Sequence, residues 1–152
     1  MTDFTYKEYL LGHTSGNAVS LIFTVFGPEV RVSQGSAVTK PLSTLSRGQQ
    51  SLREIVREYG VADCPLMTEK ALEFADRVLG YCREDVDNKL LLKDFLPNFW
   101  EMMRRVAHRY QQAFEKILAT ANPTKVVVGD VCYSLKRHTL VVTAGNVITE
   151  YK

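Results

Sequence analysis

The feature that most constrains the fold of this chain is an amphipathic segment at residues 96–121. When successive side chains are turned by 100°, as in an α-helix, apolar and polar residues separate onto opposite sides over about seven turns. The apolar side carries Phe99, Met103, Val106, Tyr110, Phe114, Ile117 and Ala121. The polar side carries Glu101, Arg104, Arg105, His108, Arg109, Gln112, Glu115 and Lys116. This separation predicts one unbroken helix, about 39 Å long, that covers a hydrophobic core.

The segments before and after the helical region have the patterns of β-strands. Residues 18–26 present apolar side chains on both faces, which is typical of an interior strand, whereas residues 29–33 alternate apolar and polar side chains. Turn-forming residues at 129–130, 136–137 and 145–146 divide the last part of the chain into a meander. We expect strands at residues 4–11, 18–26, 29–33, 125–128, 131–135, 138–143 and 147–151.

Shorter helices are expected between the two strand blocks. Ser46, followed three residues later by Gln49, has the spacing of a capping box and predicts the start of the first helix. Thr68 is expected to cap the second helix. The inward side of that helix carries Ala71, Leu72, Ala75, Val78, Leu79 and Cys82. We interpret the charged run at residues 83–87 as a break, followed by a short helix at residues 88–95.

This order of strands, helices and strands predicts an α+β fold, and 152 residues suit a single domain spanning residues 1–152. We expect one antiparallel sheet built from the N-terminal and C-terminal strands, with three or four central helices packed on one face. Such a sheet would bring the chain termini close together, as is common in domains. Two separate sheets are the alternative at this stage.

Composition excludes several classes of protein and partner. Hydrophobic residues make up 45% of the chain and charged residues 24%, so a disordered chain is excluded. The net charge of +2 is too small to indicate nucleic acid or a membrane surface by itself. No apolar run approaches the roughly 18 residues of a membrane span, and no secretory signal is visible. We therefore expect no membrane association and a cytoplasmic location.

The cysteines indicate packing and not chemistry. Cys64, Cys82 and Cys132 are odd in number, and no two have the C-x-x-C spacing. The chain therefore has no sign of a disulfide framework or a metal site. Reduced thiols buried as small hydrophobic groups are the expectation.

The common catalytic and cofactor motifs are absent, so the sequence favours a protein without catalysis and without a cofactor. The third-ranked hypothesis is an enzyme acting on phosphate esters through His13 and His138, whose imidazoles would act as acid and base. Each histidine is followed by a threonine. Only His13 has a second hydroxyl residue, Ser15, in the next position, because Leu140 stands there after His138.

The polar side of the long helix gives the second-ranked hypothesis, nucleic-acid binding. Clustered basic side chains can neutralise phosphates. The candidate residues are Arg104, Arg105, His108 and Arg109 on the helix, with Lys136 and Arg137 at a hairpin tip. Against this interpretation, Glu101 stands four residues before Arg105 and can pair with it along the helix.

The apolar side of the helix gives the hypothesis ranked first. It spans about 160° around the axis, which is more than the roughly 100° needed to cover a core. Aromatic and methionine side chains at its margin are typical of protein–protein contacts. The candidate interface residues are Phe95, Phe99, Trp100, Met102 and Met103. We expect a small binding or adaptor protein whose partner is another protein or a second copy of itself.

Overall fold

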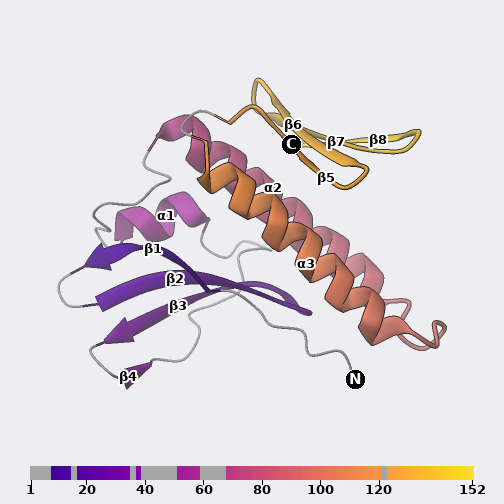
Figure 1. Cartoon of the computed structure of the whole chain (residues 1–152), viewed down its shortest axis with the longest axis horizontal. Coiled ribbons are helices and arrows are strands. Elements are labelled where there is room, and N and C mark those ends of the chain that lie inside the picture. The colour runs from indigo at the N-terminus through magenta and orange to yellow at the C-terminus, as the bar shows by residue number, and fades with distance from the viewer. Residues whose placement is uncertain (1–7, 15–16, 35–36, 39–50, 59–67, 121–122) are drawn as a thin grey trace.

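The computed structural model is an α+β arrangement in which helices lie between two antiparallel sheets (Figure 1). It describes residues 8–14, 17–34, 37–38, 51–58, 68–120 and 123–152. The strands of the first sheet are β1 (Glu8–Thr14), β2 (Asn17–Thr24), β3 (Gly27–Gln34) and β4 (Ala37–Val38). The helices are α1 (Leu52–Glu58), α2 (Glu69–Leu90) and α3 (Phe99–Leu118). The strands of the second sheet are β5 (Lys125–Val128), β6 (Val131–Lys136), β7 (Thr139–Ala144) and β8 (Val147–Tyr151).

The prediction of one sheet shared by both ends of the chain is wrong. Each sheet pairs only strands that are neighbours in sequence, in the orders β1-β2-β3-β4 and β5-β6-β7-β8. Helix α3 packs against both β2 and β5, while α2 packs against β3 and β7. The physical reason is the wide apolar arc of the long helix, which one sheet does not fill. The helices therefore have a sheet on each side and are not confined to one face (Figure 1).

Aromatic contacts show the two sides of this core. On the side of the first sheet, the ring of Phe114 lies 5.7 Å from that of Phe23 and 5.7 Å from that of Tyr9, between centroids. On the side of the second sheet, the ring of Tyr110 lies 6.1 Å from that of Tyr133. Edge-on and tilted contacts at these separations stabilise beyond the burial of apolar area. The rings that hold the two sheets therefore come from successive turns of α3.

Helix α2 is longer than predicted, because the charged run at residues 83–87 does not break it. Thr68 caps its start as predicted, with its hydroxyl accepting a hydrogen bond from the Ala71 N–H at 3.3 Å. Within the run, Arg83 faces Asp87 at 3.8 Å and Asp85 pairs with Lys89 at 2.5 Å, each pair four residues apart. Such pairs support a helix. The charges are therefore part of the helix and its contacts.

Helix α3 confirms the long amphipathic helix over Phe99–Leu118, but it starts later than residue 96. Residues 91–95 and 97–98 form turns, and the Phe99 N–H donates to the Leu96 carbonyl at 3.3 Å. The prediction of a separate short helix at residues 88–95 is also wrong, because α2 continues to Leu90 and turns follow at residues 91–95. Residue 121 lies outside the described residues.

Several boundaries of the other elements also follow the predictions. Strands β5 and β8 have the predicted bounds, and the β6–β7 turn is shifted by one residue to residues 137–138. Ser46 and Gln49 lie outside the described residues. The described start of α1 has a different cap, in which the hydroxyl of Ser51 accepts from the Glu54 N–H at 3.2 Å and donates to the Glu54 carboxylate at 3.3 Å.

Gly27, at the start of β3, lets the first sheet approach α2. Its φ of +112° is a conformation that favours glycine, and a Cβ there would lie 2.9 Å from the Arg83 Cζ. Arg83 is buried and donates a hydrogen bond to the Phe26 carbonyl while facing Asp87. Its guanidinium therefore cannot yield without losing these contacts.

Gly27→Ala should destabilise the fold by about 2–4 kcal/mol, because backbone strain adds to the collision with Arg83. Gly145→Ala is the matched control. It also has a positive φ, +62°, but a Cβ there would meet nothing within 4 Å, so the expected cost is only about 1 kcal/mol. Urea unfolding of both variants measures the difference. Equal losses of stability would contradict the close approach of Gly27 to Arg83.

Candidate functional site

Large apolar side chains are exposed where α2 passes into α3. We call this surface the apolar end; it comprises Phe26, Leu91, Leu92, Phe95, Leu96 and Trp100. Phe95 is 77% exposed and Leu91 76%, while the Trp100 ring lies edge-on to that of Phe26 at 5.8 Å and that of Phe99 at 5.0 Å. The α2–α3 connection projects from the end of the helix pair (Figure 1). The apolar end thus holds six of the large apolar side chains that are exposed among the described residues, while others, such as Val147 and Ile148, lie on β8.

The predicted interface residues divide between this surface and the core. Phe95 and Trp100 are exposed, and Met102 is partly buried. Phe99 and Met103 are buried in the core. The remaining members of the apolar end were missed by sequence reasoning. Leu91 and Leu92 fell within a predicted short helix, Leu96 stood at the start of the predicted long helix, and Phe26 fell within a predicted strand. No local pattern marked these four as surface residues.

Two opposite charges lie within the apolar end. Lys93 and Asp94 are exposed and stand between the apolar pairs Leu91-Leu92 and Phe95-Leu96. Neither side chain has a hydrogen bond or ion pair within the part of the chain that the structure describes. Among the described residues, the surface therefore offers an apolar area in which an unpaired cation and an unpaired anion stand side by side.

The basic side chains of α3 are partly engaged within the molecule. Arg105 pairs with Glu101 at 3.0 Å, and Arg109 lies 3.7 Å from Asp85 with its guanidinium 5.5 Å from the Tyr110 ring centre. His108 is exposed, Arg104 is half-buried, and Lys136 and Arg137 are exposed at the β6–β7 hairpin.

The basic face of α3 and the basic β6–β7 hairpin contact α2 at different points along its length. Arg109 reaches α2 at Asp85, whereas His138, next to Arg137 in the hairpin, reaches it at Glu73. These two contact points are about 18 Å apart along the helix. The structure therefore places the basic helix face and the basic hairpin as separate groups.

The two histidines of the catalytic hypothesis belong to different sheets. The backbone of His13 lies in β1, paired with Ala18, and its side chain lies outside the described residues. His138 is exposed at the β6–β7 turn, where its Nδ1 lies 2.5 Å from a carboxylate oxygen of Glu73. Among the described side chains, the group that His138 contacts is thus a carboxylate on α2 and not a second histidine.

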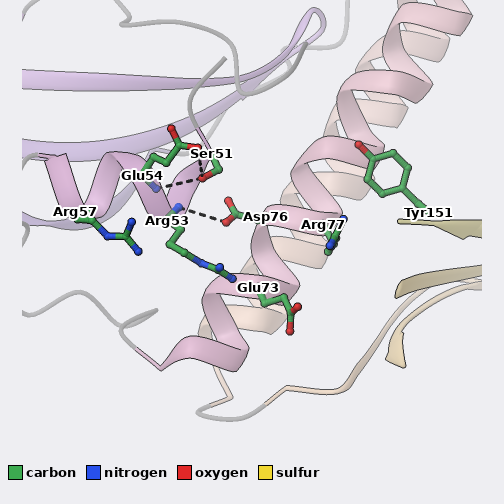
Figure 2. A pocket seen from close by; sticks show the side chains of 8 residues that line it. All are labelled: Ser51, Arg53, Glu54, Arg57, Glu73, Asp76, Arg77 and Tyr151. Carbon is green, nitrogen blue, oxygen red and sulfur yellow. Dashed lines mark hydrogen bonds between the residues drawn. The ribbon is translucent and has the colours of Figure 1, made fainter. Parts of the chain in front are cut away.

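A polar hollow of about 460 Å³ lies between α1 and α2 and is the second candidate site (Figure 2). We call it the arginine hollow. It is lined by Ser51, Arg53, Glu54, Arg57, Glu73, Asp76, Arg77 and Tyr151. An adjoining hollow of about 630 Å³ shares Arg53, Glu73 and Arg77 and adds Glu69, Lys70, Arg137 and His138. Sequence reasoning missed this site, because its residues come from α1, α2 and one end of the second sheet, where Tyr151 lies beside the β6–β7 turn.

The carboxylates of the arginine hollow are already engaged. Asp76 accepts hydrogen bonds from the backbone N–H groups of Leu52 at 2.6 Å and Arg53 at 3.4 Å, and so fastens the start of α1 to α2 (Figure 2). Glu54 bonds to Ser51, and Glu73 to His138. Burial raises the pKa of Asp76 to about 6, and the two backbone hydrogen bonds oppose this rise.

The comparisons with known proteins do not place this chain. No protein-family model matches it, and neither a curated protein nor a solved structure does. No helix in the described part of the chain has the length and apolar character needed to cross a bilayer. Among the same residues, no group of three or more histidine, cysteine or acidic side chains is arranged to hold a metal ion.

The raised pKa of Asp76 predicts a particular dependence of stability on pH. Between about pH 4 and pH 6 the unfolded chain has lost this proton while the folded chain retains it, so stability should fall as the pH rises. The loss from this group should reach about 3 kcal/mol and level off above pH 6. Asp76→Asn should flatten that slope, because the amide oxygen still accepts a hydrogen bond but carries no titrating proton. An unchanged slope in urea unfolding from pH 4 to pH 7 would contradict this role.

Proposed function

We propose that this chain is a small non-catalytic binding protein that works through protein contacts at the apolar end, and that the occupant is a second copy of the chain. The observation that supports this is the concentration of exposed apolar side chains within residues 91–100, joined by Phe26. Contiguous apolar patches on a folded chain commonly mark interaction sites. Burying one such large side chain contributes about 1.5–3 kcal/mol, so a few of them suffice for a stable contact.

The charges between these side chains favour a second copy over an unrelated partner. In a two-fold symmetric contact the same patch meets itself, so it must be complementary to itself. Lys93 and Asp94 satisfy this condition, because Lys93 of one copy can face Asp94 of the other, and the reverse. The leucines and aromatic rings on either side would exclude water from these two ion pairs. An apolar area with a single type of charge would not have this property.

Phe95→Asp should weaken self-association at least about tenfold in sedimentation equilibrium, because it places a charge in the apolar area. Ile148→Asp is the matched control: Ile148 is 67% exposed on β8, away from the apolar end, and its change should leave the association constant as it is. A wild-type chain that stays monomeric at high micromolar concentration would contradict the proposal. So would an association that Ile148→Asp removes and Phe95→Asp does not.

A charge exchange tests the symmetric geometry. Lys93→Asp and Asp94→Lys should each weaken association several-fold, because each leaves like charges facing across the contact. The double variant Lys93→Asp/Asp94→Lys should recover most of the loss, because opposite charges meet again. If the double variant loses as much free energy of association as the two single variants together, Lys93 and Asp94 do not face each other across a two-fold axis.

A further inference from the structure

We infer that the arginine hollow and the hollow adjoining it form a binding site for a small, multiply charged anion of the phosphate-ester or polyphosphate class. The inference concerns the surface between α1, α2 and the β6–β7 hairpin. It is independent of self-association at the apolar end. Three observations support it: the lack of short ion pairs to the arginines among the described residues, the hydrogen bonds of the carboxylates to other groups, and the volume of the two hollows.

The arginines of the hollow form no short ion pair with any acidic side chain that the structure describes. Within the described part of the chain, no carboxylate lies within ion-pair distance of the guanidinium of Arg53, Arg57 or Arg77. The Nε of Arg53 is buried and has no hydrogen-bond acceptor among the same residues. Figure 2 shows the Arg53 side chain extending from α1 toward α2. A guanidinium group with no carboxylate within ion-pair distance can receive the oxygens of an anionic ligand.

The carboxylates of the hollow make their hydrogen bonds to other groups and form no ion pair with these arginines within 4.0 Å among the described residues, although Arg53 still attracts the charge of Asp76. Asp76 accepts a hydrogen bond from the backbone at the start of α1, Glu54 accepts one from Ser51, and Glu73 is hydrogen-bonded to His138. The adjoining hollow adds two basic side chains, Lys70 and Arg137. The donors of the joined site therefore come from α1, α2 and the β6–β7 hairpin. Planar guanidinium groups suit phosphate oxygens, because they can donate two parallel hydrogen bonds.

The size of the site favours a compact ligand over a polymer. Volumes of about 460 Å³ and 630 Å³ are in the range of pockets that hold small molecules. Glu69 and Glu73 lie among the basic side chains of the adjoining hollow, where they would repel a continuous run of phosphates. A small ligand with a few charges can lie between the arginines and avoid these carboxylates. A nucleic-acid strand cannot do so along its length.

Isothermal titration calorimetry with sodium tripolyphosphate at 150 mM ionic strength tests the site. The wild-type chain should bind with a stoichiometry of one per chain, and Arg53→Gln and Arg77→Gln should each weaken binding about tenfold or more. Arg105→Gln is the matched control, because it removes the same charge from an arginine that is 78% exposed on α3. It should leave the affinity within about twofold. Circular dichroism confirms that each variant is folded, and Arg77→Gln carries the test if Arg53→Gln disturbs α1.

Three results would overturn the inference. The first is the absence of binding at millimolar tripolyphosphate. The second is an equal loss of affinity in Arg105→Gln and Arg77→Gln, which would mean attraction to net charge and not to a site. The third is a twelve-nucleotide single strand that binds more than a hundredfold tighter than tripolyphosphate and loses that affinity in Arg77→Gln, which would assign the hollow to nucleic acid.

Discussion

The structure depends on the helix pair α2 and α3, which presents one apolar surface to the first sheet and another to the second. Each of the two sheets has one face covered by α2 and α3, so both sheets use the same helices to complete their core. Phe114 packs toward the first sheet and Tyr110 toward the second, one turn apart on α3. Removing either sheet would expose one apolar side of both helices. This shared core is the physical reason to expect the chain to fold as one domain.

Polar groups inside the helix pair fix how the two helices meet. Asp85 of α2 accepts a hydrogen bond from the Tyr110 hydroxyl at 2.9 Å and also faces Lys89 and Arg109. Burial is the main cause that raises the pKa of Tyr110 well above its usual range, so this hydroxyl stays a donor. A partly buried carboxylate with several donors sets one relative height of the two helices, because a shift by one turn would leave it unpaired.

Local patterns were sufficient for the features that depend on neighbours in sequence. The amphipathic stripe of α3, the cap at Thr68 and the turns of the second sheet are all set within a few residues. The break predicted at residues 83–87 is wrong, because charges of this run pair along the helix. The four-residue spacings of Arg83 with Asp87 and of Asp85 with Lys89 were the signal for a continuous helix. The width of the apolar stripe was likewise the signal for two sheets.

The candidate sites could not be predicted in full, because each is assembled by tertiary contacts. Trp100 and Phe95 could be proposed from the helix margin, but Phe26 joins them only through the approach of the first sheet to α2 and α3. The arginine hollow needs α1 beside α2, and that placement follows from a hydrogen-bonded carboxylate at Asp76. The two surfaces lie roughly 25 Å apart along α2, so each can act without the other.

The most direct measurement of the central claim is a NOESY spectrum of the labelled chain. The account predicts cross-peaks from the Phe114 ring to the Phe23 ring and from the Tyr110 ring to the Tyr133 ring, whose centroids are 5.7 Å and 6.1 Å apart. Both sets should occur in one monomer, and no cross-strand peaks should join β1–β4 to β5–β8. Loss of the Tyr110–Tyr133 peak, or amide peaks that link strands of the two sheets, would contradict a helix pair held between them.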